Sequence, residues 1–120
     1  MRIKNDSGLE YEDLKEAEGP AIENGTIVSI QYEIALTYNA LDKGELIDSS
    51  YQRRTPLNFV VGKGSVVKGV DEGILLMRVG GLRRLLIPSY LAFGERGVPG
   101  VIPPDAMLFV DIKVRDIVAQ

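Results

Sequence analysis

The stretch IPSYLAFGERGVPGVIPPD, residues 87–105, connects two apolar strand-like runs and carries no helix or strand period of its own. Three prolines and three glycines lie between Phe93 and Asp105. Loops of this length are uncommon in compact domains and are usually functional. Because proline reduces the chain entropy lost on ordering, the loop can hold its apolar side chains in place. We therefore predict that it covers an apolar, extended partner with Leu91, Phe93, Val98, Val101 and Ile102.

The composition of the 120 residues is that of an ordinary globular domain, with 45% hydrophobic and 26% charged residues. The chain has no cysteine, which excludes disulfides, thiolate nucleophiles and cysteine metal sites. It also has no histidine, which excludes imidazole bases and nearly all zinc sites. We therefore expect a single domain over residues 1–120 that uses no metal and no cofactor.

The charge and polarity of the chain limit its partners. A net charge of -3 argues against nucleic acid, because phosphate binding needs a basic surface, and we expect Arg53-Arg54 and Arg83-Arg84 to be solvated. No apolar run approaches the length of a membrane span, so no membrane association is expected. Residues 1–19 are too polar for a signal peptide. We expect a cytoplasmic monomer, with a removed export signal as an open alternative.

Alternating apolar residues predict the strands. Residues 1–25 are charged and contain a short edge strand near residues 8–14. Residues 26–36 form a half-buried strand, whose inward face carries Val28, Ile30, Tyr32, Ile34 and Leu36. Further strands are predicted at residues 45–50, 57–62, 82–88 and 106–118.

One helix is predicted between these strands. Ser65 is a good N-cap residue, and Gly80-Gly81 is a suitable end. The apolar residues between them recur at helical spacing, at Val66, Val67, Val70, Ile74 and Met77. This stripe indicates a helix that lies across one face of a sheet. The predicted fold class is therefore α+β, with about five antiparallel strands and one helix.

Several polar residues permit two interpretations. The sequence VVGKGSVVKG suggests a phosphate-binding loop, but its glycine spacing fits neither nucleotide motif and no βαβ unit surrounds it. Tyr32 is either a core aromatic residue or a ligand contact, and Asp48 either caps a turn or orients a site. Asp71 and Glu72 are adjacent on the predicted helix and do not converge, so we expect a solvated face.

The chain resembles the FKBP-type peptidyl-prolyl isomerases over nearly its whole length. The resemblance rests on SGLEYEDL from Ser7, VSIQY ending at Tyr32, IDSS from Ile47, and LNFVVGKGSVVKGVDEGILLMRVGGLRRLLIP from Leu57. The last block is LAFGERGVPGVIPPDAMLFVDI. Several spaced blocks in the same order make this match highly specific. The resemblance implies a strongly twisted antiparallel sheet wrapped around one short helix.

The resemblance also implies a function and a site. The function would be cis–trans isomerisation of X–Pro bonds in peptides or unfolded protein segments, with macrolides that mimic proline as weak ligands. The implied catalytic residues are Tyr32, Asp48, Val67 and Phe93, where the Val67 amide donates to a substrate carbonyl and Asp48 polarises one rim. The implied substrate-binding residues are Ile47, Leu57, Val66, Val70, Val101, Ile102 and Val110. Such a site works by desolvation and transition-state binding, without nucleophile, metal or cofactor.

The departures from the family pattern all make the pocket more aliphatic. Val70 stands where the family usually has tryptophan at the pocket floor, and Ile47, Leu57 and Val110 stand where it favours phenylalanine. Phe93 replaces a tyrosine whose hydroxyl usually donates to the ligand. Each exchange of an aromatic residue for valine withdraws on the order of 100 Å² of contact surface. The hairpin of residues 36–45 is also about five residues longer than in the family.

Two functions therefore stay open. The first is an isomerase that is slower and less sensitive to macrolides than typical members. The second is a protein-binding or chaperone-like module with the FKBP fold and little or no catalysis. Retention of Tyr32, Asp48, Val66-Val67 and residues 97–105 favours the isomerase, and loss of the aromatic floor favours the binding module.

Overall fold

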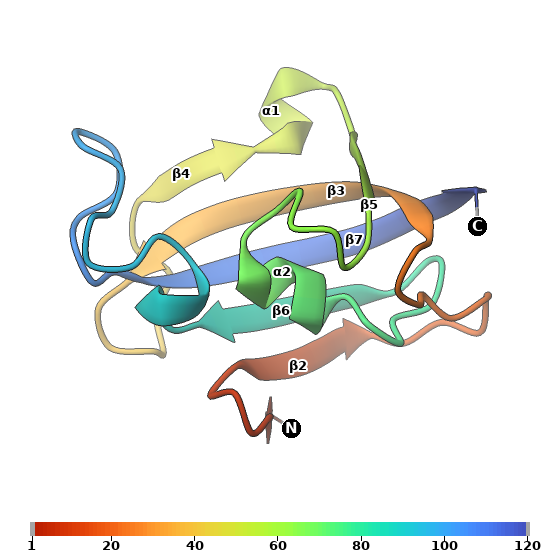
Figure 1. The fold of residues 1–120 in the computed structure, drawn as a ribbon, viewed down its shortest axis with the longest axis horizontal. Helices are drawn as coiled ribbons and strands as arrows, with labels where there is room; N and C mark the ends of the chain where they lie inside the picture. Colours follow the sequence, from red (N-terminus) through yellow and green to blue (C-terminus); the bar gives the residue numbers. More distant parts are fainter. Residues whose placement is uncertain (1, 120) are drawn as a thin grey trace.

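A computed structural model describes residues 2–119 as one twisted antiparallel sheet with short helices (Figure 1). Within these residues the sheet has seven strands in the order β1-β2-β6-β7-β3-β4, and β5 pairs with β3. The strands are β1 (Ile3–Lys4), β2 (Glu10–Lys15), β3 (Ile27–Thr37), β4 (Leu46–Ser49), β5 (Leu57–Val60), β6 (Leu82–Ile87) and β7 (Met107–Ala119). The helices are α1 (Ser50–Arg53), α2 (Lys68–Gly73) and a 3-10 turn, η1 (Ser89–Leu91). The predicted α+β class is confirmed.

Six of the seven described strands lie where the sequence predicts a strand, and only β1 has no predicted counterpart. The additional strand, β1, pairs with β2 through only two residues, Ile3 opposite Tyr11 and Lys4 opposite Glu10. Two residues are too few to show an alternating pattern, so the sequence gives no signal for this strand.

Strands β3 and β7 form the longest pairing in the sheet, from Ile27 opposite Ala119 to Thr37 opposite Met107. The inward face predicted for β3 is confirmed, since its apolar residues belong to or pack against the hydrophobic core: Val28, Ile30, Tyr32, Ile34 and Leu36. These two strands therefore form the centre of the sheet, against which the other elements pack.

Helix α2 is shorter than the sequence predicts. It begins after Val67 rather than after Ser65, and it ends at Gly73 rather than near Gly80. Its end is fixed from outside the helix, because the Leu76 amide donates to the Ile22 carbonyl at 2.9 Å instead of continuing the helical pattern. No helix within residues 2–119 is long and apolar enough to cross a membrane.

Two glycines allow α2 to lie directly on β6, as Figure 1 shows for the two elements. A Cβ atom added to Gly69 would lie 2.4 Å from Cγ2 of Ile87, and one added to Gly73 would lie 2.6 Å from both Cδ atoms of Leu85. Neither distance leaves room for a side chain. The absence of side chains at these two positions therefore sets how closely the helix approaches the sheet.

Arg83 of β6 is buried, with 8% of its surface exposed, so the prediction that it is solvated is wrong. Its Nε donates to Oδ1 of Asp13 at 2.6 Å, and its Nη1 donates to the carbonyls of Gly73 at 2.9 Å and Leu75 at 3.2 Å. The guanidinium also lies 4.3 Å from the ring centroid of Tyr11. A buried cation needs such partners, and here they join the end of α2 to strands β2 and β6.

Arg84, on the other face of β6, is ion-paired rather than free in solvent. Its Nε and Nη2 donate to the two carboxylate oxygens of Asp111 at 2.8 and 3.0 Å, and Lys43 donates to the same carboxylate at 3.1 Å. Burial would raise the pKa of Asp111, but the hydrogen bonds from Arg84 and Lys43 outweigh it and hold this pKa below its ordinary value. Lys43 thereby fastens the loop between β3 and β4 to β7.

We expect the substitution Gly69→Ala to destabilise the protein by about 1–3 kcal/mol, because the new methyl group overlaps Ile87. Helix propensity alone predicts the opposite sign, a gain of about 0.5–1 kcal/mol. Urea denaturation measures the difference, with Lys68→Ala as a control on the exposed side of the same helix. A stabilised Gly69→Ala protein would contradict the close packing of α2 on β6.

The lowered pKa of Asp111 predicts how stability depends on pH. An aspartate whose pKa is lower in the folded state stabilises the protein above its ordinary pKa of about 4, and this contribution is lost as pH falls through the folded-state pKa. We expect Asp111→Asn to be less stable at neutral pH and to lose less stability in acid. Unfolding free energies measured across the acid range test this expectation, and parallel pH profiles of the two proteins would refute it.

Candidate active site

An apolar cavity of about 310 Å³ opens between α2 with its preceding segment and the inward face of β3 and β7. Its lining residues come from β3, β5, the segment before α2, α2 itself, the loop after β6, and β7. They are Ile30, Tyr32, Ile34, Leu57, Ser65, Val66, Val67, Val70, Phe93, Val110 and Ile112. Nine of these eleven side chains are aliphatic or phenyl groups, so the cavity strips water from whatever it binds.

The bottom of the cavity reaches the hydrophobic core. Ile30 and Ile112 line it although both belong to the most deeply buried residues of the protein. Val70 of α2 lines the same cavity and is 6% exposed. The inner part of the lining is therefore aliphatic, with valine on the helix and isoleucine on the strands.

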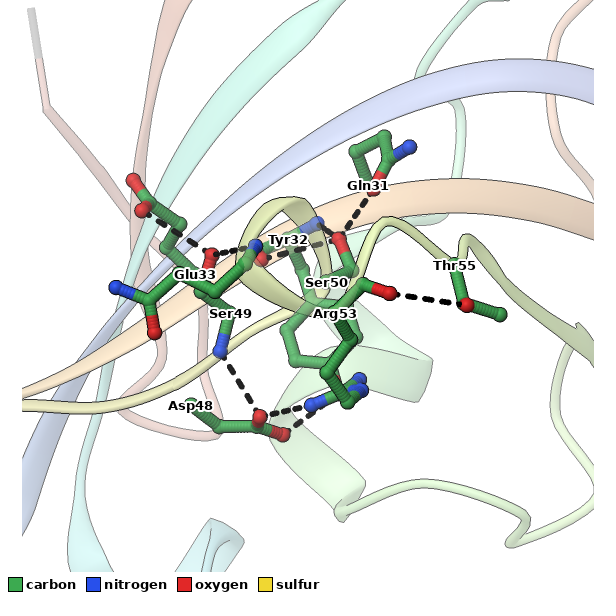
Figure 2. A network of polar contacts seen from close by, with 9 residues as sticks. Gln31, Tyr32, Glu33, Asp48, Ser49, Ser50, Arg53 and Thr55 are labelled. Atoms are coloured by element: carbon green, nitrogen blue, oxygen red, sulfur yellow. Dashed lines mark hydrogen bonds and ion pairs between the residues drawn. The ribbon is translucent and has the colours of Figure 1, made fainter.

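A three-residue polar network holds the Tyr32 hydroxyl at the cavity wall (Figure 2). This hydroxyl donates to Oδ2 of Asp48 at 2.7 Å and accepts from Nη2 of Arg53 at 2.6 Å. Nη1 of Arg53 in turn donates to Oδ1 of Asp48. The guanidinium carbon lies 5.5 Å from the centroid of the Tyr32 ring. The phenol is thus fixed between an anion and a cation, with Asp48 and Arg53 partly exposed to solvent.

The Tyr32 phenol keeps its proton near neutral pH. Burial, followed by the hydrogen bond to Asp48, raises the pKa of Tyr32, while Arg53 acts in the opposite direction. A protonated phenol is a hydrogen-bond donor and not a base. Together with the absence of histidine and cysteine from the sequence, this leaves the cavity without a group suited to proton abstraction or nucleophilic attack.

Serines at the start of α1 fasten this network to β3, as Figure 2 shows. The Tyr32 amide donates to Oγ of the buried Ser50 at 2.7 Å, and this hydroxyl donates to Oε1 of Gln31 at 2.5 Å. Ser49 caps α1 by accepting from the Gln52 amide at 3.3 Å. The cap of α1 is thus Ser49 and not Asp48, and the helical turn that it starts places Arg53 against the Asp48 carboxylate.

The Val67 amide lies at the start of α2, where backbone donors lack helical partners. Among the residues that the structure describes, no acceptor is bonded to this amide. Asp71 positions the preceding turn, since its carboxylate accepts from the amides of Gly62 at 2.9 Å and Gly64 at 3.0 Å. The prediction that Asp71 belongs to a merely solvated face is therefore wrong, and so is that for Glu72, which accepts from Ser7 at 2.6 Å.

The structure brings together most of the site residues that the sequence predicts. The ones that line the cavity are Tyr32, Leu57, Val66, Val67, Val70, Phe93 and Val110. Asp48 adjoins it through Tyr32.

Three predicted residues, Ile47, Val101 and Ile102, lie outside the lining of this cavity. Val101 and Ile102 line a separate groove, because a backbone bridge between Val98 and Ile102 folds the loop back on itself. The structure therefore does not place Val101 and Ile102 in the lining of the cavity, as the sequence predicted, but in that of the groove.

Sequence reasoning missed five residues of the site. Ile30, Ile34 and Ile112 belong to alternating strand faces that were predicted to be core, and only the small size of Val70 indicates that they line a cavity. Ser65 was interpreted as a helix cap. Arg53 was interpreted as solvated. It lies five residues after Asp48, and this spacing indicates a contact between the two side chains only if the residues between them are known to form a helical turn. Within residues 2–119 no cluster of three carboxylates could hold a metal ion.

Comparisons with known proteins point to one family. Residues 19–115 match the family model described as FKBP-type peptidyl-prolyl cis-trans isomerase. Peptidyl-prolyl cis-trans isomerase FPR2 of Saccharomyces cerevisiae is 48% identical over 93 residues, which are 78% of this chain and 66% of that protein. FK506-binding protein 1A of Neurospora crassa is 39% identical over 115 residues, covering 95% of this chain and 92% of that protein.

The same likeness holds in three dimensions. The crystal structure of AtFKBP13 superposes with a TM-score of 0.86 at 34% identity, and the match covers 98% of each chain. Other relatives are longer: the chain spans 23% to 28% of the proteins named FK506-binding protein 4 that it matches in Emericella nidulans, Dictyostelium discoideum and Neurospora crassa.

The network around Tyr32 predicts the effect of removing its cation. Because Arg53 lowers the pKa of the Tyr32 phenol and Asp48 raises it, we expect Arg53→Met to raise this pKa further. The Cζ chemical shift of Tyr32, followed by NMR as a function of pH, measures the change. Arg54→Met is the matched control, since the neighbouring arginine has no contact with the phenol. A lower pKa in Arg53→Met would contradict the assigned network.

Proposed function

The chain belongs to the family of FKBP-type peptidyl-prolyl cis-trans isomerases, and from this premise we propose that it catalyses the cis–trans isomerisation of X–Pro bonds in peptides or unfolded protein segments. The observation that carries the proposal is the apolar cavity, in whose lining only Tyr32 and Ser65 have side chains with hydrogen-bonding groups. Proline is the residue type whose ring is apolar and whose preceding bond isomerises slowly, so that a catalyst is useful.

The proposed mechanism needs no proton transfer. Rotation about a peptide bond is opposed by amide resonance, with a barrier of about 18–20 kcal/mol. Resonance places partial charges on oxygen and nitrogen, and water stabilises this polar planar form. An apolar cavity withdraws that water, which favours the less polar twisted bond. Binding the twisted state more tightly than either planar state then lowers the barrier.

The residues of the cavity divide this work between them. Val70, Phe93 and Leu57 would enclose the proline ring, because they line the cavity from three different elements. The Val67 amide would donate to a carbonyl of the substrate and so fix its orientation. The Tyr32 hydroxyl, held by Asp48 and Arg53, supplies a fixed dipole at the wall. Preorganised groups of this kind lose little entropy when the substrate binds.

Ligands that mimic proline should bind weakly. Several relatives carry the name FK506-binding protein. In this chain Val70 offers less contact surface than an aromatic residue, and Phe93 has no hydroxyl to donate a hydrogen bond. We therefore propose that macrolides of this kind bind here with lower affinity than to a site with an aromatic floor.

Exchange of short X–Pro peptides between their cis and trans forms, followed by NMR with varied X, tests the proposed activity. We expect clear acceleration by the wild-type protein and at least about a tenfold loss in the double variant Tyr32→Ala, Asp48→Ala. Asp6→Ala, an exposed carboxylate outside the cavity, is the control and should keep full activity. Circular dichroism establishes that each variant is folded.

Wild-type protein that is folded and binds these peptides, but does not accelerate exchange, would contradict the proposed activity. This result would favour the alternative function, that of a binding or chaperone-like module with the same fold. Because the peptides are observed directly, this outcome is distinguished from a protein that binds no proline peptide at all.

The substitution Val70→Trp tests the assignment of the cavity floor. An indole at this position would cover Ile30 and Ile112 and contact the proline ring, so we expect binding of a proline-containing ligand to tighten by about tenfold. Isothermal titration calorimetry measures the affinity, and Val118→Trp, at an exposed position near the end of β7, is the control. A weaker ligand affinity in folded Val70→Trp would show that Val70 is not the floor.

A further inference from the structure

A second groove, of about 510 Å³, has no role in the proposed mechanism. It runs between the loop of residues 37–45, which joins β3 to β4, and the loop of residues 94–105. Figure 1 shows both loops at the same end of the sheet. The lining residues are Leu36, Tyr38, Glu45, Arg96, Pro99, Gly100, Val101, Ile102, Pro103 and Pro104.

The groove and the cavity share strand β3 as a wall. Ile34 lines the cavity and Leu36 lines the groove, and the two side chains point to the same face because they are two residues apart in one strand. Their separation along β3 is therefore about 7 Å, which an extended peptide spans with about two residues. A polypeptide with its proline in the cavity reaches the groove without a turn.

The first loop is held in one conformation by its own polar residues. Oδ1 of Asn39 accepts from the amides of Leu41 and Asp42, both at 2.9 Å, and Nδ2 of Asn39 donates to Asp42 at 3.0 Å. Lys43 ties the same loop to Asp111 at 3.1 Å. The backbone that follows Tyr38 is thus held in place before any ligand binds, which reduces the entropy cost of ordering this loop.

The second loop is equally constrained. The amides of Val98 and Ile102 each donate to the carbonyl of the other, at 2.9 and 2.8 Å. The Gly97 amide donates to the Phe93 carbonyl at 3.1 Å, and Ile102 is buried in the core. These backbone hydrogen bonds therefore connect the loop residues that line the groove to Phe93, which lines the cavity.

The chemistry of the groove selects an uncharged apolar side chain. Tyr38 is 77% exposed and Val101 is 49% exposed, although both are large apolar residues beside three prolines. One acidic and one basic side chain, Glu45 and Arg96, complete the lining, so the groove favours neither sign of charge. An exposed apolar surface of this kind next to a binding cavity marks an interaction site.

We propose that this groove binds an apolar side chain of the same polypeptide substrate, about two residues away from the X–Pro bond. The inference rests on the proposed function of the adjacent cavity and deepens it, because it gives the protein a preference for apolar residues near proline. Tyr38 comes from the hairpin of residues 36–45, which the sequence predicts to be longer than in the family, so we expect the preference to be a feature of this chain.

Binding of labelled peptides, measured by fluorescence anisotropy, tests the groove. Each peptide contains one X–Pro bond in an alanine background, with a leucine two positions before the proline, two positions after it, or absent. We expect one of the two leucine peptides to bind about fivefold more tightly than the alanine peptide. The position that does so gives the direction of the bound chain.

Two variants of the same loop serve as test and control. Tyr38→Ala should abolish the gain from leucine, whereas Leu41→Ala should retain it, because Leu41 is 75% exposed but does not line the groove. Equal binding of all peptides, or a leucine gain that persists in Tyr38→Ala, would overturn the proposal. So would self-association of the wild-type protein that Tyr38→Ala abolishes, since a second copy would then occupy the groove.

Catalysed exchange of the alanine peptide, measured on the same samples, tests the proposed function separately. Acceleration of its exchange without any leucine preference would leave the isomerase in place and refute the groove. A leucine preference without acceleration would support the groove and refute catalysis.

Discussion

The contact between α2 and β6 determines where the walls of the cavity stand. Gly69 and Gly73 present no side chain to Ile87 and Leu85, so the helix axis lies closer to the sheet than any other residue pair would allow. Arg83 then fixes the end of the helix by donating to the Gly73 carbonyl. Val67 and Val70 are carried by this helix, and their distance from β3 and β7 follows from its depth.

The polar groups of the site act through position rather than through proton transfer. Tyr32, Asp48 and Arg53 are all hydrogen-bonded to one another, and the phenol of Tyr32 keeps its proton. The Tyr32 side chain also lines the apolar cavity. A bond rotation needs such an arrangement, because the chemical change is a loss of resonance and not a bond cleavage. The aliphatic side chains of the cavity offer less contact surface than aromatic ones would, and the fixed polar groups are those of Tyr32, Asp48 and Arg53.

The strands and the fold class were predictable because alternation with one buried face is a local property of the sequence, as in β3. The ends of α2 were not predictable, since Leu76 and Arg83 fix them through partners elsewhere in the chain. Two-residue β1 has no pattern to detect.

The same distinction applies to the site. The resemblance supplied most of the cavity residues, but it did not supply Ile30, Ile34 and Ile112, which the strand pattern shows only as core residues and which also line the cavity. Arg53 joins Asp48 only because Ser49 starts a turn of helix between them. Val101 and Ile102 line a second groove instead of the cavity because the backbone bridge between Val98 and Ile102 folds their loop. The pattern of side chains in the sequence does not predict this backbone contact.

The most direct test of the account is a structure of the protein bound to a peptide with one X–Pro bond, by crystallography or by intermolecular NOEs. We expect the proline ring to lie between Tyr32, Val70 and Phe93 and a peptide carbonyl to accept from the Val67 amide. A proline ring bound elsewhere, for instance between Tyr38 and Val101, would contradict it, because the cavity on the inward face of β3 and β7 would then not be the site of isomerisation.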